Sequence, residues 1–234
     1  METKRNTKSW TAKKENEKPA VNPGVKKVHN LIIVDESGSM SVIYGAALNG
    51  MNDTLKKIRQ LASECPEQEQ EVTLVTFDTG HYNEIFRSSP AEKTRTITRN
   101  DYRPNGATPL YDAMGKALND LEGKVKENEA VLVTVITDGY ENASCEYSLA
   151  DIRALVERLD SAGWLFTYIG ANQDSSRVGA EMGIADTLDF CADAESTAKM
   201  WNEQNESREA FVRMSRTPDF CAKNYQRGSF FKKK

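Results

Sequence analysis

Five oxygen-bearing side chains in this sequence could together hold a metal ion. They are Asp35, Ser37, Ser39, Thr108 and Asp138. The first three alternate along one short segment, D-E-S-G-S, so their side chains could turn toward one point. Thr108 lies between the flexible Gly106 and the rigid Pro109, and the last of the five belongs to a Thr-Asp-Gly sequence. Each residue alone could be a turn former or a helix cap, but the complete set in this order predicts a metal site.

The chemistry of this ligand set indicates which metal it would bind. Oxygen ligands without His or Cys suit a hard cation and argue against zinc or copper. We predict Mg2+, with Mn2+ or Ca2+ as alternatives, because Mg2+ keeps several waters and needs few carboxylates, whereas Ca2+ typically recruits about 6 to 8 oxygens. Since hydroxyl ligands are neutral, the charge of the ion is poorly compensated. An open coordination position should therefore favour an Asp or Glu carboxylate from a partner protein.

Strands and helices must alternate along the chain to position these residues. The apolar run at 28–34 is typical of a strand buried on both faces, and apolar residues from Ile43 to Ala62 recur at helical spacing. Further strands are expected at 71–77, 82–86, 130–137, 164–169 and 187–191, and further helices at 110–125, 152–159, 175–182 and 194–214. The pattern predicts an α/β fold with a doubly wound, mostly parallel sheet, one antiparallel edge strand and helices on both faces.

The predicted ligands follow strands or precede a helix, which would bring them to one edge of the sheet. In doubly wound sheets, ligands bind beyond the carboxyl ends of the strands, where the strand order reverses. Asp35 follows the first strand, and Asp138 follows the most hydrophobic strand, which should be central. Thr108 lies near the end of a long polar connection, 88–109, and loops of that length are often functional.

The motifs at these positions resemble those of the von Willebrand factor A (vWA) family and its metal-ion-dependent adhesion site. The resemblance consists of D-x-S-x-S at 35–39, the lone threonine at 108 and T-D-G at 137–139, and the order of strands and helices extends it over about 28–214. It implies a Rossmann-like vWA fold. Small intracellular bacterial members, including those resembling tellurium-resistance-associated proteins, are similar in consisting of little more than this domain.

The same resemblance implies roles for the individual ligands. Ser37, Ser39 and, in one state, Thr108 would bind the ion directly, whereas Asp35 and Asp138 would act partly through water. A partner carboxylate would take the remaining position. In some members of the family, a helix shift is linked to occupancy of the site.

A Mg2+-dependent phosphatase or similar hydrolase that uses Asp35 is the alternative function. A strand followed by Asp resembles haloacid-dehalogenase-type phosphatases, but that chemistry needs a second acid two residues later, where this chain has Ser37. His29 would be about 20 Å from Asp35 along a strand that rises about 3.3 Å per residue, so we expect it to be structural rather than a catalytic base. His81 could lie at the correct edge, in an exposed turn. No G-x-S-x-G or G-x-x-x-x-G-K-[ST] motif is present, and we predict a non-catalytic interaction module.

Charge is distributed unevenly along the 234 residues, whose formal net charge is -4. Residues 1–27 hold 8 basic and 3 acidic side chains, and residues 213–234 hold 7 and 1. We predict a basic N-terminal arm at 1–27, a vWA domain at 28–217 and a basic C-terminal tail at 218–234. The arms could reach nucleic acid, but charge runs are usually solvated, and no function is predicted for them. Glu36 and Asp78 lie outside the metal motif and are also expected to be solvated.

Other sequence features restrict the location and the chemistry. No apolar stretch approaches the roughly 20 residues of a membrane span, and the N-terminal residues lack the apolar core of a secretory signal, so we predict a cytoplasmic protein. The four cysteines are widely spaced and form no C-x-x-C pair. Neither a zinc knuckle nor a disulfide framework is therefore expected.

Overall fold

The structure is a computed structural model that describes residues 24–218 and 220–231. The strands are β1 (Lys27–Asp35), β2 (Glu69–Phe77), β3 (Tyr82–Pro90), β4 (Glu129–Thr137), β5 (Leu165–Ala171) and β6 (Asp186–Phe190). The α-helices are α1 (Tyr44–Glu64), α2 (Leu110–Glu122), α3 (Leu149–Ser161), α4 (Ser175–Met182) and α5 (Ala194–Ser215). Short 3-10 helices are η1 (Gly38–Ile43), η2 (Ala91–Lys93) and η3 (Ala222–Asn224). Strands and helices alternate as predicted, with boundaries that differ by a few residues.

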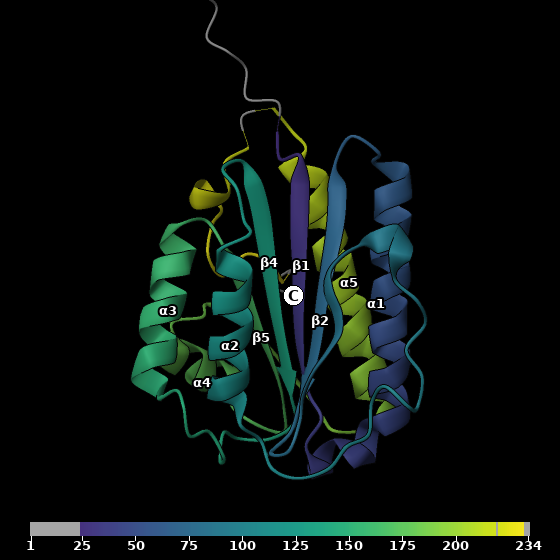
Figure 1. Cartoon of the computed structure of the whole chain (residues 1–234), viewed down its shortest axis with the longest axis vertical. Coiled ribbons are helices and arrows are strands. Elements are labelled where there is room, and N and C mark those ends of the chain that lie inside the picture. Colours follow the sequence, from purple (N-terminus) through teal and green to yellow (C-terminus); the bar gives the residue numbers. More distant parts are fainter. Residues whose placement is uncertain (1–23, 219, 232–234) are drawn as a thin grey trace, which may run out of the picture.

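The strands form one sheet in the order β3-β2-β1-β4-β5-β6. β1 pairs in parallel with both β2 and β4, and β3 pairs with β2 in the antiparallel direction at the edge of the sheet. The chain builds one half of the sheet outward from β1 and then returns to β4 to build the other half (Figure 1). The predicted fold class is confirmed, and the strand order reverses between β1 and β4.

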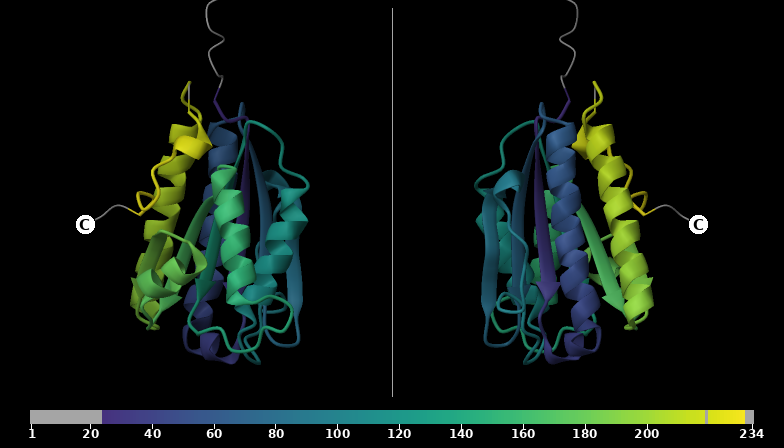
Figure 2. Two further views of the ribbon diagram at one scale, coloured as in Figure 1. Left: turned by 90° about the vertical axis from the view of Figure 1, so that its left-hand side faces the viewer. Right: turned by 90° about the vertical axis from the view of Figure 1, so that its right-hand side faces the viewer.

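Two separate hydrophobic cores hold the helices to the two faces of the sheet. In β1, Val28, Ile32 and Val34 pack in the core that includes residues of α1 and α5, whereas Leu31 and Ile33 pack in the core that includes residues of α2, α3 and α4. Because successive side chains of a strand point to opposite faces, this nearly continuous apolar run serves both cores. Figure 2 shows the resulting three layers from two sides. None of the helices in the described part of the chain is long and apolar enough to cross a membrane.

The polar connection predicted at 88–109 is partly regular structure. β3 continues to Pro90, beyond the predicted end at 86, and η2 follows it directly. The edge position explains why polar residues can form this strand, since only one of its sides pairs with a neighbour. Its register against β2 shifts near Val72 and Leu74, and Ser88, at a positive φ of 42°, donates its backbone N–H to Thr73 Oγ1.

The described residues of the predicted C-terminal tail pack against the domain. Phe230 and Phe231 are buried, and Asp186 at the start of β6 accepts hydrogen bonds from the backbone N–H groups of Gly228 and Phe230. The rings of Tyr225 and Phe230 also contact Phe211 of α5. The predicted N-terminal arm lies mostly outside the described residues.

Candidate metal centre

The structure brings all five predicted ligands to one edge of the sheet. Asp35 is the last residue of β1, and Asp138 directly follows β4, the neighbouring parallel strand. Ser37 and Ser39 lie where the chain leaves β1 and enters η1, and Thr108 lies two residues before α2. This edge, at the bottom of Figure 1, is the point where the strand order reverses. Its position agrees with the usual placement of ligand sites in doubly wound sheets.

Hydrogen bonds connect four of the ligands directly. Ser37 donates its backbone N–H to Asp35 Oδ1 over 2.7 Å, which closes the tight turn after β1. The hydroxyl oxygens of Ser37 and Ser39 lie 3.2 Å apart, and Ser39 Oγ donates to Asp138 Oδ1 over 2.6 Å. The loops that follow β1 and β4 are thereby joined through the side chains that were predicted as ligands.

Gly139 locates the fifth ligand, Thr108, within the same cluster. A Cβ atom added to Gly139 would lie 3.0 Å from Thr108 Oγ1 and 3.8 Å from both Asp35 Oδ2 and Ser39 Oγ. Three predicted ligand oxygens thus surround a position that only a glycine leaves open. The residues present fit a small, hard cation, because these donors are all oxygens and they converge where no side chain fills the space.

Burial changes the acidity of both carboxyl groups. Asp35 is 0% exposed, and this burial raises its pKa to about 6, although Thr137 and Ser37 donate hydrogen bonds that act in the opposite direction. Burial also raises the pKa of Asp138 above its ordinary value, against the effect of the hydrogen bond from Ser39. Among the described residues, no Lys, Arg or His forms an ion pair with either carboxyl group. A bound cation would favour the ionised form of both.

The hydroxyl groups are essential to this interpretation. Within the described ranges, no three His, Cys, Asp or Glu side chains are grouped so that they could hold a metal ion. The cluster contains two carboxyl groups, and the remaining predicted donors are hydroxyls of Ser and Thr. The two carboxyl groups therefore supply all of the negative charge that the predicted ligands offer a cation, and the other donors are neutral.

Neighbouring residues that the sequence did not indicate hold the ligands in place. The Tyr102 hydroxyl donates to the backbone carbonyl of Asp35 over 2.9 Å, and the Tyr102 ring stacks on Tyr44 of α1. Asn142 holds Thr108 from both sides, since its side-chain oxygen accepts from the Thr108 N–H at 2.9 Å and its own N–H donates to the Thr108 carbonyl at 3.2 Å. Tyr102 had no motif to indicate it, whereas Asn142 follows the Thr-Asp-Gly sequence closely.

The prediction that Glu36 and Asp78 are solvated is wrong. Each is only 6% exposed, and its carboxylate accepts a hydrogen bond from a backbone N–H group. Arg103 N–H donates to Glu36 Oε1, and Gly80 N–H donates to Asp78 Oδ1. These two acids hold the loops at the carboxyl edge of the sheet, where the predicted ligands lie. His81 lies in the turn between β2 and β3, as predicted, and its side chain is 71% exposed beside Asp78.

His29 lies near the opposite end of β1 and has a structural role, as expected. Its side chain is 3% exposed and lies between two glutamates. Nδ1 is 2.9 Å from Glu71 Oε1, and Nε2 is 2.7 Å from Glu129 Oε2. The three side chains connect β1 to both of its neighbouring strands.

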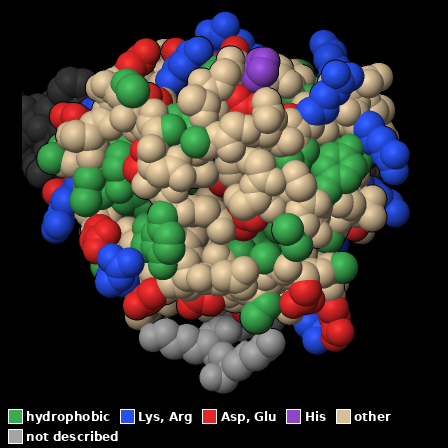
Figure 3. All heavy atoms as spheres, turned by 90° about the horizontal axis from the view of Figure 1, so that it is seen from below, with side chains coloured by type: hydrophobic (Ala, Val, Ile, Leu, Met, Phe, Trp, Pro, Cys, Tyr) green, Lys and Arg blue, Asp and Glu red, His purple; other side chains and the backbone are tan. Residues whose placement is uncertain are grey.

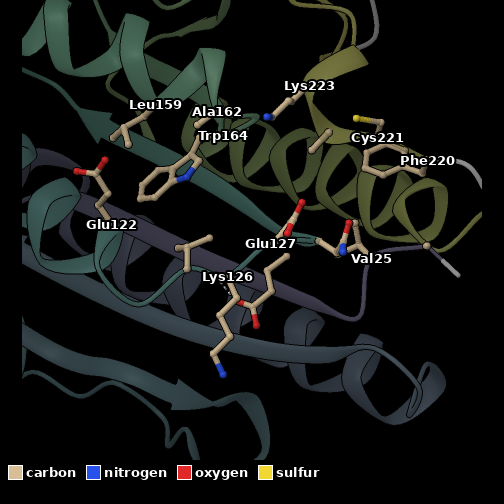
Figure 4. Close-up of a pocket in the computed structure, with 15 residues that line it drawn as sticks. Val25, Glu122, Lys126, Glu127, Leu159, Ala162, Trp164, Phe220, Cys221 and Lys223 are labelled. Atoms are coloured by element: carbon tan, nitrogen blue, oxygen red, sulfur yellow. Dashed lines mark hydrogen bonds between the residues drawn. The ribbon is translucent and has the colours of Figure 1, made fainter. Parts of the chain in front are cut away.

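A pocket with a volume of about 440 Å³ lies near the amino ends of β1 and β4, at the opposite end from the predicted metal ligands. In Figure 4, the Trp164 ring, the Glu127 carboxylate and the Lys223 side chain face the same space. None of the five predicted ligands lines this pocket. Its charged groups are of both signs, so the lining favours no single class of ligand.

Part of the chain matches a known protein family. A family model described as von Willebrand factor type A domain matches residues 31–141, a range that includes all five predicted ligands. No curated protein sequence matches the chain.

Several solved structures have a similar fold. The PilB minor pilin from Streptococcus sanguinis has a TM-score of 0.57 and 14% identity, and the match covers 81% of this chain and 63% of that one. The pilus adhesin SpaC from Lactobacillus rhamnosus GG, in an open conformation, has a TM-score of 0.61 and 14% identity, with coverage of 83% and 31%. The vWF domain of the type V pili tip protein Mfa5 from Porphyromonas gingivalis has a TM-score of 0.58 and 9% identity, with coverage of 80% and 97%.

These comparisons support a vWA domain in this chain. At such identities, the structural likeness concerns the fold alone. The chain spans less than two thirds of the PilB and SpaC chains, so the activities of those whole proteins do not transfer with the fold.

Proposed function

We propose that this chain, which has the fold of a vWA domain, is a metal-dependent module that binds an acidic group of a partner protein. One observation carries the proposal. Two carboxyl groups, Asp35 and Asp138, meet at the switch point of the sheet with no cationic side chain of the described residues paired to them, and hydroxyl groups complete an oxygen-only cluster. A divalent cation would supply the positive charge that this cluster lacks.

The five residues would contribute to ion binding in two different ways. Ser37, Ser39 and Thr108 would contribute neutral oxygens, whereas Asp35 and Asp138 would contribute negative charge. Mg2+ is the proposed ion, with Mn2+ or Ca2+ as alternatives, and when bound it would offer a coordination position to a carboxylate from the partner. Tyr102 and Thr137 keep Asp35 in place through hydrogen bonds of 2.9 Å and 2.6 Å.

An interaction role is also consistent with the relatives of this fold. SpaC is a pilus adhesin, PilB is a minor pilin and Mfa5 is a pilus tip protein. For this chain, we propose the general role of a binding module and leave the identity of the partner to experiment.

The geometry of Asp35 argues against the alternative phosphatase. A nucleophilic carboxylate needs a free oxygen with access to the substrate. Asp35 is 0% exposed, and both of its carboxylate oxygens accept hydrogen bonds, Oδ1 from Ser37 N–H and Oδ2 from Thr137 Oγ1. If the full-length protein nevertheless hydrolysed a phosphate ester with Mg2+, and Asp35→Asn abolished turnover, the binding-module proposal would be wrong.

A retention experiment tests the proposal. The immobilised protein is exposed to an extract of its native cells with Mg2+, and bound proteins are then released with EDTA. Proteins released by EDTA should be absent when Ser39→Ala and Asp138→Ala are combined. The matched control combines Ser41→Ala in η1 with Asp53→Ala in α1, two exposed positions outside the ligand set. Retention that is the same in EDTA, or that survives in the first variant, would contradict metal-dependent binding.

A further inference from the structure

Two large apolar side chains are exposed beside the candidate metal centre. Val42 in η1 is 76% exposed, and Tyr140 is 54% exposed. Val42 lies three residues after Ser39, and Tyr140 lies two residues after Asp138, the two residues whose hydrogen bond joins their loops. Met214, near the end of α5, is the other large apolar side chain with this degree of exposure in the described part of the chain. Exposed apolar side chains this near to predicted ligands in the sequence are positioned to contact a partner bound at the site.

Short segments that border the ligands also contain no charged residue. Segments 37–43, 104–109 and 139–140 contain no Lys, Arg, Asp or Glu, although 28% of the whole sequence is charged. Figure 3 views this face from below and shows Lys and Arg side chains mainly at its rim, whereas the centre consists mostly of apolar and tan groups with a few Asp and Glu atoms between them. An apolar, charge-poor centre within a polar rim is the usual anatomy of a protein interface.

This environment restricts the acidic group that the site can accept. Attraction between a metal ion and a carboxylate strengthens when uncharged surfaces exclude water around the pair. Further acidic groups on the partner would lose their hydration against these uncharged segments, and they would also meet the acids Glu36 and Glu141, which border two of the segments. A segment rich in acidic residues is therefore a poor fit, whereas one carboxylate with apolar neighbours is a good fit.

We infer that the partner presents a single Asp or Glu flanked by apolar side chains, which pack on Val42 and Tyr140 while the carboxylate reaches the metal. This inference rests on the proposed function, because the carboxylate needs a bound cation. It adds the chemical class of the partner segment and the two side chains that select it. Val42 and Tyr140, together with the three uncharged segments, form what we name the apolar collar.

Selection from a random peptide library tests this inference. Displayed linear peptides of 12 residues are captured by the full-length protein in Mg2+ and eluted with EDTA. The expected sequences contain one Asp or Glu with aliphatic or aromatic residues within about three positions. If the eluted peptides instead carried several acids among polar residues, the inference would be wrong and the proposed function would stand. If no peptide enriched for acidic residues eluted with EDTA, both would be wrong.

Variants of the apolar collar provide a second readout with the best selected peptide as the probe. Val42→Ser and Tyr140→Ser should each weaken its binding by about five- to tenfold, a change typical of losing one apolar contact in an interface. Ser41→Ala, an exposed neighbour in the same 3-10 helix, should change the affinity less than twofold. The stabilisation of each variant by Mg2+ should stay unchanged, since no predicted ligand is altered. Affinities within twofold of the original for both collar variants would overturn the inference.

Discussion

The pKa values of buried acidic side chains are shifted in opposite directions at the two ends of the parallel strands. At the amino end, Glu71 and Glu129 lie against His29, and Lys27 forms a further ion pair with Glu71. Burial alone would raise the pKa of both glutamates, but the hydrogen bond from Lys27 to Glu71 and the hydrogen bonds that join His29 to Glu71 and to Glu129 leave both pKa values below the ordinary range. At the carboxyl edge, burial raises the pKa of Asp35 and Asp138, and no described cationic side chain opposes it.

This difference separates acids that stabilise the fold from acids that are prepared for a ligand. Compensated charges at the amino end join β1 to its neighbouring strands and need nothing further. Uncompensated carboxyl groups at the other end cost stability unless a cation binds, and strongly perturbed carboxyl groups are typical of functional sites. The comparison predicts that substitutions at the two ends will have opposite effects.

The largest loss of stability is expected for His29→Ala. This change leaves two partly buried glutamates without the side chain that hydrogen-bonds to both, and a buried polar group that loses its partner is costly. Because the glutamates keep some contact with solvent, we expect a loss of about 2–4 kcal/mol in the free energy of unfolding. Urea denaturation measures it. A loss below about 1 kcal/mol would show that the amino end is not held by these charges.

The pH dependence of stability should have opposite signs at the two ends. The folded pKa of Asp35 is raised from 3.8 to about 6, so in EDTA its contribution is most favourable below pH 4 and is lost as the pH rises toward 6. The loss should be on the order of 2–3 kcal/mol, at 1.36 kcal/mol per pKa unit. The lowered pKa of Glu71 has the reverse effect, since its contribution is present above the unfolded pKa and is lost as the pH falls.

Difference curves between variants isolate these two contributions. Unfolding free energies are measured from pH 4 to 7 in EDTA for the unaltered protein, Asp35→Asn and Glu71→Gln. Relative to the unaltered protein, Asp35→Asn should gain stability as the pH rises, whereas Glu71→Gln should lose it. Parallel curves for the two variants would contradict the comparison.

Arg208 of α5 is also a buried charged residue, but it lies against the interior of β1 and β4 and not at their carboxyl ends. It is 0% exposed, and burial lowers its pKa. Its guanidinium donates to Asn30 Oδ1 and Thr134 Oγ1, and no carboxylate of the described residues pairs with it. We expect Arg208→Met to change the free energy of unfolding by no more than about 1 kcal/mol, because an apolar side chain of similar length avoids burying a charge.

Binding measurements decide whether Arg208 contributes to the metal site. Arg208→Met should bind Mg2+ with unchanged affinity, as measured by calorimetric titration. If this substitution abolished binding of the ion, an uncompensated charge in the core would be part of the metal site, and the distinction between the two ends would fail.

The smallest effect is expected for Asp138→Asn in EDTA. Because burial raises the pKa of this group, replacing the carboxylate by a neutral amide of similar shape should leave stability unchanged or raise it by up to about 1 kcal/mol. Thermal unfolding in EDTA checks this expectation. A loss of more than about 1 kcal/mol would mean that the carboxylate mainly stabilises the fold.

The sequence was sufficient for the parts of the site that follow from local pattern. Asp35 and Asp138 come directly after apolar runs long enough to be buried strands, and parallel pairing of those strands is enough to place the two acids at one edge. Thr108 could be predicted as a ligand because a glycine and a proline mark the start of α2. The fold class followed from the same alternation of strands and helices.

Contacts between distant segments could not be predicted in this way. Tyr102 reaches Asp35 across 67 positions, and His29 meets Glu129 across 100. Burial of Glu36 depends on a hydrogen bond to a loop that is polar and without periodicity, and burial of Phe230 depends on Asp186 in β6. Each of these depends on how the sheet brings separate segments together, which composition and spacing do not specify.

The central claim is that the carboxyl edge binds a divalent cation, and thermal unfolding with Mg2+ or EDTA tests it most directly. A ligand specific to the folded state adds RT ln(1 + [L]/Kd), about 2.7 kcal/mol at a hundredfold excess over Kd. Mg2+ should therefore raise the melting temperature of the unaltered protein and of the control that combines Ser41→Ala with Asp53→Ala. The same addition should have no effect when Ser37→Ala and Asp138→Ala are combined. An equal rise in that double variant would place the ion elsewhere and contradict the account.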